Sequence, residues 1–145
     1  MTGLPDGLCA GLGGSLSSLS LSDNRMATLP EDIGQLRRLV TLNLNGNRLT
    51  ALPASFARLG QLVTLGLGAN RIASLPADLS GLTQLRTLQL GENRLSLLPS
   101  SLGATALEWP RVAESGRDHP PLRLPSSTGA CVHLERLSSR GMPRA

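Results

Sequence analysis

The sequence contains no lysine and no tyrosine, and it has only one phenylalanine, Phe56, and one tryptophan, Trp109. The missing lysine excludes Schiff-base chemistry and any Gly-Lys-Ser/Thr phosphate-binding loop. The missing tyrosine excludes tyrosine phosphorylation. Aromatic side chains normally fill the irregular space of a core. A core made almost wholly of leucine therefore predicts a regular architecture in which one shape recurs.

Cysteine is also scarce, because only Cys9 and Cys131 are present, at opposite ends of the chain. This pattern forms no disulfide framework and is typical of a reducing compartment. The first residues lack a basic signal-peptide segment, no apolar run approaches the length of a membrane span, and no Asn-x-Ser/Thr sequon occurs. We therefore expect a cytoplasmic protein without a membrane span, with the nucleus as the alternative.

The net charge is +4 over 145 residues, of which residues 16–103 contribute +3 and the C-terminal part +2, against −1 at the start. All basic residues are arginine. This charge is mildly basic and lower than that of a dedicated nucleic-acid binder.

A set of residues recurs every 23 positions. Leucine occupies three columns without exception, first at 16, 39, 62 and 85, and again three and five residues after each of these. The columns continue with an asparagine, an apolar residue, a Leu-Pro pair and finally Ile33, Phe56, Leu79 or Leu102. Chance does not place so many columns in register, so we expect four tandem repeats at 16–38, 39–61, 62–84 and 85–103.

The spacing inside one repeat predicts its shape. Leu-x-Leu, with period two, indicates a short strand with one buried face. The later Leu-Pro-x-x-apolar-x-x-Leu has the spacing of a helical or 3₁₀ turn, and proline suits the corner before it. A single unit cannot bury its leucines, so stacked units should form a parallel sheet on one side and turns on the other. The column Gly34, Ala57, Ser80 and Gly103 is always small, as tight packing between turns requires.

The pattern L-x-x-L-x-L-x-x-N-x-L-x-x-L-P-x-x-I-x-x-L resembles the leucine-rich-repeat family over about 60% of the chain. Its 23-residue Leu-Pro form is similar to the intracellular class found in Ras-pathway and cell-polarity scaffolds. The resemblance implies an α/β solenoid with a concave parallel sheet and convex 3₁₀ or helical turns. It also implies that the asparagine column, Asn24, Asn47, Asn70 and Asn93, is structural and bonds to backbone groups. Secreted members usually carry cysteine-rich caps, which this chain lacks.

The two ends depart from the pattern. Residues 1–15 are interpreted either as an N-terminal cap or as the remnant of a further, degenerate half-repeat. Residues 104–145 lose the period at Thr105 and are rich in arginine, proline and serine, which predicts a disordered tail. No closing unit is visible. We therefore expect that the array is truncated, for example by an alternative C-terminus on a longer protein.

One column of charge follows the asparagines, at Arg25, Arg48, Arg71 and Arg94. Strands ~4.8 Å apart would place these arginines in a line along one edge of the sheet. Like charges ~5 Å apart cost about 0.8 kcal/mol per pair in water, so the line is tolerable as a solvated face without any function. It is also a candidate footprint for an acidic partner.

The outward positions of the strands form the candidate binding face, which is small, polar and nearly uncharged. It lacks the aromatic anchors that dominate many interfaces, so these side chains alone predict weak binding. The face comprises Ser18, Ser20, Ser22, Thr41, Asn43, Asn45, Thr64, Thr87, Gln89 and Glu92.

Catalytic and metal-binding patterns are missing. His133 and Glu135 form a His-x-Glu that lacks the Pro-Cys-x-x-Cys of zinc deaminases, and Asp118-His119 beside Ser126 is a coincidence that any serine-rich tail offers. We therefore expect no enzyme, no cofactor, no metal and no small-molecule substrate. The leading hypothesis is a protein-interaction module or scaffold in intracellular signalling. The alternatives are a weak binder of nucleic acid or an anionic surface, which the lack of stacking aromatics disfavours, and a poorly folding isoform without its own binding function.

Overall fold

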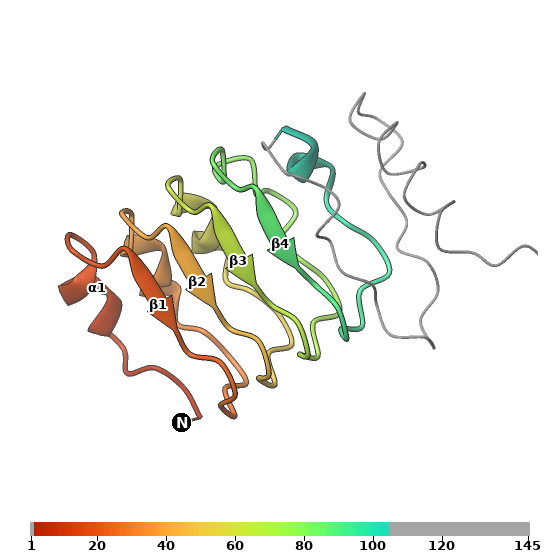
Figure 1. The fold of residues 1–145 in the computed structure, drawn as a ribbon, viewed down its shortest axis with the longest axis horizontal. Coiled ribbons are helices and arrows are strands. Elements are labelled where there is room, and N and C mark those ends of the chain that lie inside the picture. The colour runs from red at the N-terminus through yellow and green to blue at the C-terminus, as the bar shows by residue number, and fades with distance from the viewer. Residues whose placement is uncertain (1, 105–145) are drawn as a thin grey trace, which may run out of the picture.

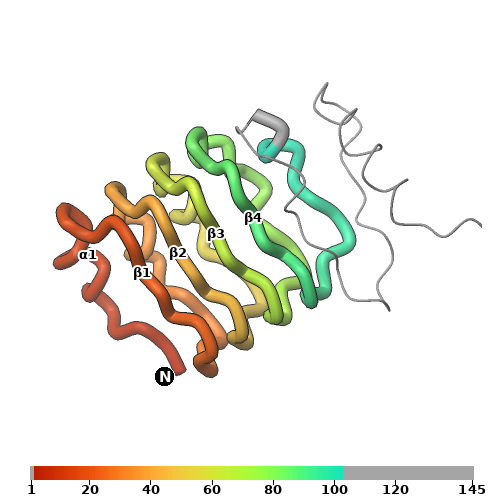
Figure 2. Tube along the Cα trace, in the orientation of Figure 1, coloured from red at the N-terminus to blue at the C-terminus, as the bar shows by residue number. Residues whose placement is uncertain are grey.

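The main feature of the protein is a four-stranded parallel sheet (Figure 1). The computed structural model describes residues 2–104. Each strand has three residues and belongs to one repeat: β1 Ser18–Ser20, β2 Thr41–Asn43, β3 Thr64–Gly66 and β4 Thr87–Gln89. The strands lie side by side in chain order, and Figure 2 shows every repeat as one turn of a coil. The predicted solenoid with a parallel sheet is confirmed.

The strands pair in the register that the 23-residue period predicts. Leu19 pairs with Leu42, Leu42 with Leu65, and Leu65 with Leu88. Because a shift of one residue would turn every leucine to the solvent side, this register fixes which face is buried. The leucine columns of the second, third and fourth repeats are buried, whereas Leu19 of the first repeat is only partly buried.

A bifurcated hydrogen bond precedes β2, β3 and β4. The Ser17 carbonyl oxygen accepts from the N–H of Val40 at 2.8 Å and from the N–H of Thr41 at 3.1 Å, and the same arrangement recurs in the next two repeats. Two successive N–H groups therefore point at one carbonyl, which interrupts the alternation of a regular strand. As a result, Val40 and Thr41 both lie outside the core, between the buried Leu39 and Leu42.

Short 3₁₀ helices follow the Leu-Pro pairs on the side opposite the sheet (Figure 1). In the first and second repeats, each begins with an N–H donated to the proline carbonyl at 3.1 Å. Gly34 is needed at the first of these turns, because a Cβ there would collide with the Ser55 carbonyl of the next. These helices are η1 Glu31–Gln35, η2 Ala54–Arg58 and η3 Ser100–Ala104.

The third repeat has no 3₁₀ helix at this position, although its sequence fits the pattern. The N–H of Leu79, which would bond to the Pro76 carbonyl, donates instead to the Ser101 Oγ at 2.9 Å. The Ser101 hydroxyl in turn donates to the Ala77 carbonyl at 3.0 Å. A side chain from the fourth repeat thus takes the place of the local bond, and the turn loses its helical form.

The first residues form α1, Leu8–Leu12, which packs beside η1 and places Cys9 in the core. Residues 105–145, which include most of the predicted tail, lie outside the described part of the chain.

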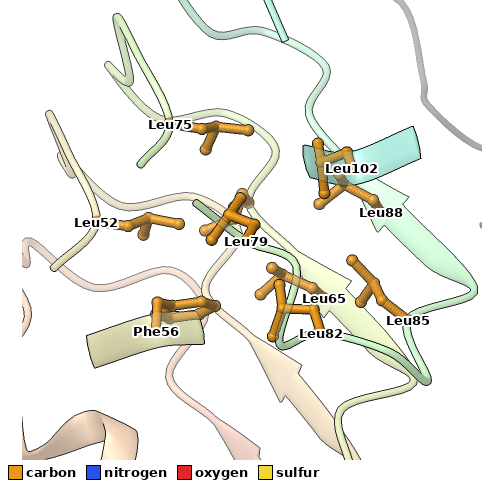
Figure 3. A pocket seen from close by; sticks show the side chains of 10 residues that line it. Leu52, Phe56, Leu65, Leu75, Leu79, Leu82, Leu85, Leu88 and Leu102 are labelled. Carbon is orange, nitrogen blue, oxygen red and sulfur yellow. The ribbon is translucent and has the colours of Figure 1, made fainter. Parts of the chain in front are cut away.

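A small cavity lies in the core near the altered turn of the third repeat (Figure 3). Phe56 borders it from η2, Leu79 from the altered turn and Leu102 from η3. All its lining residues are leucines apart from Phe56. A cavity lined in this way offers no polar group to orient a ligand, so we interpret it as a packing gap.

Candidate functional site

Asn47, Asn70 and Asn93 of the asparagine column are buried and connect neighbouring repeats, whereas Asn24 is partly buried and donates to the carbonyls of Leu21 and Ser22 in its own repeat. The Asn70 Oδ1 accepts from the N–H of Leu49 at 3.0 Å, and its Nδ2 donates to the carbonyls of Leu44 at 2.9 Å and Leu67 at 3.0 Å. Asn47 and Asn93 make the equivalent bonds one repeat earlier and one repeat later. Because both ends of these amides are occupied by backbone, they are not available to a partner.

The outward face of the sheet is polar and open to solvent. Ser18, Ser20 and Gln89 are exposed, as is Glu92 at the end of the fourth repeat. The remaining members of the predicted face are partly exposed: Ser22, Thr41, Asn43, Asn45, Thr64 and Thr87. All ten predicted residues are thus exposed or partly exposed.

An amide clasp crosses this face. The Asn45 Oδ1 accepts from the N–H of Gly68 at 2.7 Å, and its Nδ2 donates to the Gln89 Oε1 at 3.0 Å. The Asn45 side chain can pack this close to the backbone of the sheet because Gly66 and Gly68 lack a Cβ. A Cβ at Gly66 would meet both terminal atoms of the Asn45 amide at 2.9 Å. Sequence reasoning assigned Asn45 and Gln89 to the face but did not predict that they bond across two repeats.

The arginine column forms a line at the end of the strands where the chain leaves the sheet. All four side chains are exposed. The backbone N–H groups of Arg48, Arg71 and Arg94 each donate to a carbonyl of the preceding repeat at 2.9 Å. A continuous hydrogen-bonded ladder thus holds the column at the spacing of neighbouring strands, ~4.8 Å.

Acidic residues accompany only the outer members of this line. Asp23 and Glu92 stand two residues before Arg25 and Arg94, whereas the second and third repeats have Gly46 and Ala69 at that position. All four of these positions have a left-handed backbone, with φ between 53° and 70°. The Asp23 carboxylate lies against Gly46, where a Cβ would collide with it.

The opposite edge of the face carries two exposed valines that sequence reasoning missed. Val40 is 40% exposed and Val63 is partly exposed, each at the kink before its strand. The equivalent residues of the outer repeats are polar, Ser17 and Arg86. The alternation of inward and outward side chains along a strand does not predict that Val40 and Val63 point outward, because it does not anticipate the bifurcated hydrogen bond.

Two titratable groups have altered pKa values. Burial and, to a smaller extent, the nearby Asp32 carboxylate, which disfavours a second negative charge, together raise the pKa of the Cys9 thiol to about 11. At neutral pH this thiol is therefore protonated and a poor nucleophile. Hydrogen bonds from the Ser80 hydroxyl and N–H lower the pKa of Asp78, which is an exposed surface carboxyl.

The part of the chain that the structure describes holds no group of three or more His, Cys, Asp and Glu side chains that could bind a metal ion. None of its helices is long and apolar enough to cross a membrane. The His-x-Glu and Asp-His pairs of the tail lie outside the described residues.

Comparison with known proteins decides the family. The family description for leucine-rich repeats matches residues 14–72 and 39–95, which together span more than half of the chain. The chain belongs to the leucine-rich-repeat family. No curated protein sequence matches this leucine-rich-repeat chain.

Solved leucine-rich-repeat structures share its fold. A leucine-rich-repeat protein of Leptospira interrogans is 27% identical with a TM-score of 0.75, over 93% of this chain and 32% of that one. The ectodomain of the Arabidopsis thaliana receptor kinase GASSHO1/SCHENGEN3, solved with CASPARIAN STRIP INTEGRITY FACTOR 2, is 37% identical with a TM-score of 0.64, over 73% of this chain and 13% of that one. The Drosophila Toll–Spatzle complex is 26% identical with a TM-score of 0.67, over 85% and 17%. This chain therefore spans about a third or less of the chains that it resembles.

Proposed function

We propose that this leucine-rich-repeat protein is a non-catalytic protein-interaction module that binds its partner through the outward face of the sheet and the arginine line. The observation that carries the proposal is the polar face itself. Four repeats present side chains on one rigid platform, so contacts from several repeats can add without a large ordering cost. Two of the solved relatives, the GASSHO1/SCHENGEN3 ectodomain and Toll, were solved with another protein bound.

The arginine line gives the partner its expected charge. Exposed positive side chains along one edge steer an acidic protein toward the face and raise its association rate. The convex turns lack such a shared feature, because their residues differ from repeat to repeat, as at Glu31-Asp32, Ala54-Ser55 and Ala77-Asp78.

We place this activity in intracellular signalling, in the cytoplasm or the nucleus. The support is the scarcity of cysteine and the 23-residue Leu-Pro repeat. Cys9, in α1 before the first repeat, is a buried, free thiol. Fluorescence microscopy of the tagged full-length chain tests the location, and exclusive secretion would contradict it.

The binding proposal is tested by capturing proteins from a cytosolic extract on the immobilised full-length chain. A captured protein should bind Arg48→Glu/Arg71→Glu more slowly than wild type, and its binding should become less sensitive to salt. Unchanged rates at all salt concentrations would contradict a role for the arginine line.

The arginine line also favours a second candidate function, a weak binder of nucleic acid or of an anionic surface. That function predicts a steep linear fall of log affinity for nucleic acid with log salt concentration, because each phosphate contact releases counterions. The further alternative, a poorly folding chain, predicts no cooperative melting transition by circular dichroism.

A further inference from the structure

The second and third repeats differ from the outer two along the whole length of the binding face. At the start of the strands, only these repeats carry an apolar residue, Val40 and Val63, where the outer repeats have Ser17 and Arg86. At the other end, their arginines, Arg48 and Arg71, are the two without an acidic residue two positions earlier. Both differences fall on the same pair of neighbouring strands, β2 and β3.

From this arrangement we infer that the binding site is centred on the second and third repeats and takes an extended, amphipathic segment of an acidic protein, with an apolar side chain over Val40 and Val63 and an acidic side chain over Arg48 and Arg71. The inference rests on the proposed function and specifies the chemistry of its partner.

The apolar end can supply the anchor that the rest of the face lacks. Exposed valine side chains gain free energy when a partner removes them from water, whereas the serine, threonine and asparagine positions have little apolar area to offer. Val40 is among the few large apolar side chains of the described residues that are clearly exposed. The bifurcated hydrogen bond before β2 turns the Val40 side chain outward, so its exposure follows from the backbone conformation.

The basic end fixes the direction of the partner. An acidic side chain can approach Arg48 and Arg71 together, because the backbone ladder holds them ~4.8 Å apart. Glu92 stands at one end of the line, and the Asp23 carboxylate lies against Gly46, two residues before Arg48. Both carboxylates repel a longer run of acidic residues. This charge pattern fits one or two carboxylates and disfavours an extended polyanion such as nucleic acid.

The middle of the proposed binding site, between the valines and the arginines, has small side chains and no charge. Gly66 and Gly68 carry no side chain, and the Asn45 amide lies flat across them toward Gln89. A partner backbone can therefore approach the sheet closely. From Val40 to Arg48 the chain runs eight residues and turns at Gly46, where φ is 70°. The two Cα atoms therefore lie no further apart than roughly 26 Å, the span of eight extended residues at ~3.3 Å each. An extended partner would thus separate its apolar and acidic side chains by at most about eight positions.

The test is a selection of random twelve-residue peptides, displayed on phage, against the full 145-residue chain. Enriched peptides should combine a large apolar residue with an Asp or Glu at most about eight positions away. Fluorescence polarisation then measures the Kd of the best peptide. We expect Val40→Ser/Val63→Ser and Arg48→Glu/Arg71→Glu each to weaken binding at least about tenfold.

Matched changes in the outer repeats serve as controls. Arg86→Ser should change the Kd less than about threefold, and the pair Arg25→Glu/Arg94→Glu, at the ends of the arginine line, should weaken binding clearly less than the inner arginine pair. Circular dichroism checks that every variant melts like wild type. Three outcomes would overturn the inference while leaving the proposed function standing. The inner and outer arginine pairs could weaken binding equally, the valine pair could leave the Kd unchanged, or the selection could enrich no peptide. Peptides that depend on the convex Arg37 and Arg58 would overturn the proposed function itself.

Discussion

Replacement of Asn70 by alanine should destabilise the solenoid far more than its size suggests. The side chain is 7% exposed and bonds to the N–H of Leu49 and to the carbonyls of Leu44 and Leu67, at 2.9 to 3.0 Å. Each such bond contributes about 1 kcal/mol net, and a buried N–H left without an acceptor costs a further 1–3 kcal/mol or so. Three bonds and one unpaired N–H therefore give an expected loss of about 4–6 kcal/mol in the free energy of unfolding.

A loss of this size is a large fraction of the ~5–15 kcal/mol that holds a typical domain together. Because 1 kcal/mol moves the Tm of a domain this small by roughly 4–8 °C, the Tm should fall by more than ~10 °C. Circular dichroism during heating, together with urea unfolding, measures both quantities.

The matched control for Asn70→Ala is Gln89→Ala, which removes an exposed amide with a single side-chain bond to Asn45. It should lower the free energy of unfolding by less than about 1 kcal/mol. If both variants melted at the same temperature, the asparagine ladder would not be what joins one repeat to the next.

Three further changes test other parts of the fold. Leu65→Asp should abolish the cooperative melt, because it buries an unpaired carboxylate at a side chain that is 2% exposed, whereas Thr64→Asp should melt within a few degrees of wild type; equal melting of the two would place the strand register one residue off. Ala69→Gly should raise the Tm by a few degrees, because Ala69 has a left-handed backbone with φ 53°. The control Ala57→Gly, in η2, should lower the Tm. A lower Tm in both variants would argue against strain at Ala69. Finally, stability should be flat at neutral pH and fall from about pH 9 to pH 11, because the unfolded Cys9 thiol loses its proton at the lower value while the native thiol keeps it to about 11. The chain has no Lys or Tyr to mask this titration, and an unchanged slope in Cys9→Ser would assign the loss to another group.

The sequence predicts the repeats, the sheet register and the buried columns because all three follow from one 23-residue period. Exceptions arise where a contact joins different repeats. The third turn is not helical because Ser101, from the next repeat, takes the N–H of Leu79, and no pattern within one repeat contains that information. The clasp between Asn45 and Gln89 spans two repeats in the same way.

The candidate site was predicted only in part. Alternation places Asn43, Asn45 and the threonines on the outward face, and the structure puts them there. The exposure of Val40 and Val63 depends on a bifurcated backbone bond that side-chain patterns do not reveal. The tail from residue 105 onward, predicted to be disordered, lies outside the described residues, and that prediction stands untested.

The measurement that tests the central claim most directly compares the two sides of the solenoid in binding to a captured partner. Surface plasmon resonance would measure the Kd of wild type, of Asn43→Arg/Gln89→Arg on the outward face of the sheet, and of Arg37→Glu/Arg58→Glu on the convex turns. The outward pair places two long charged side chains where a partner must dock, so its binding should be lost, while the convex pair should bind like wild type. Loss of binding in the convex pair with an intact outward pair would contradict the account.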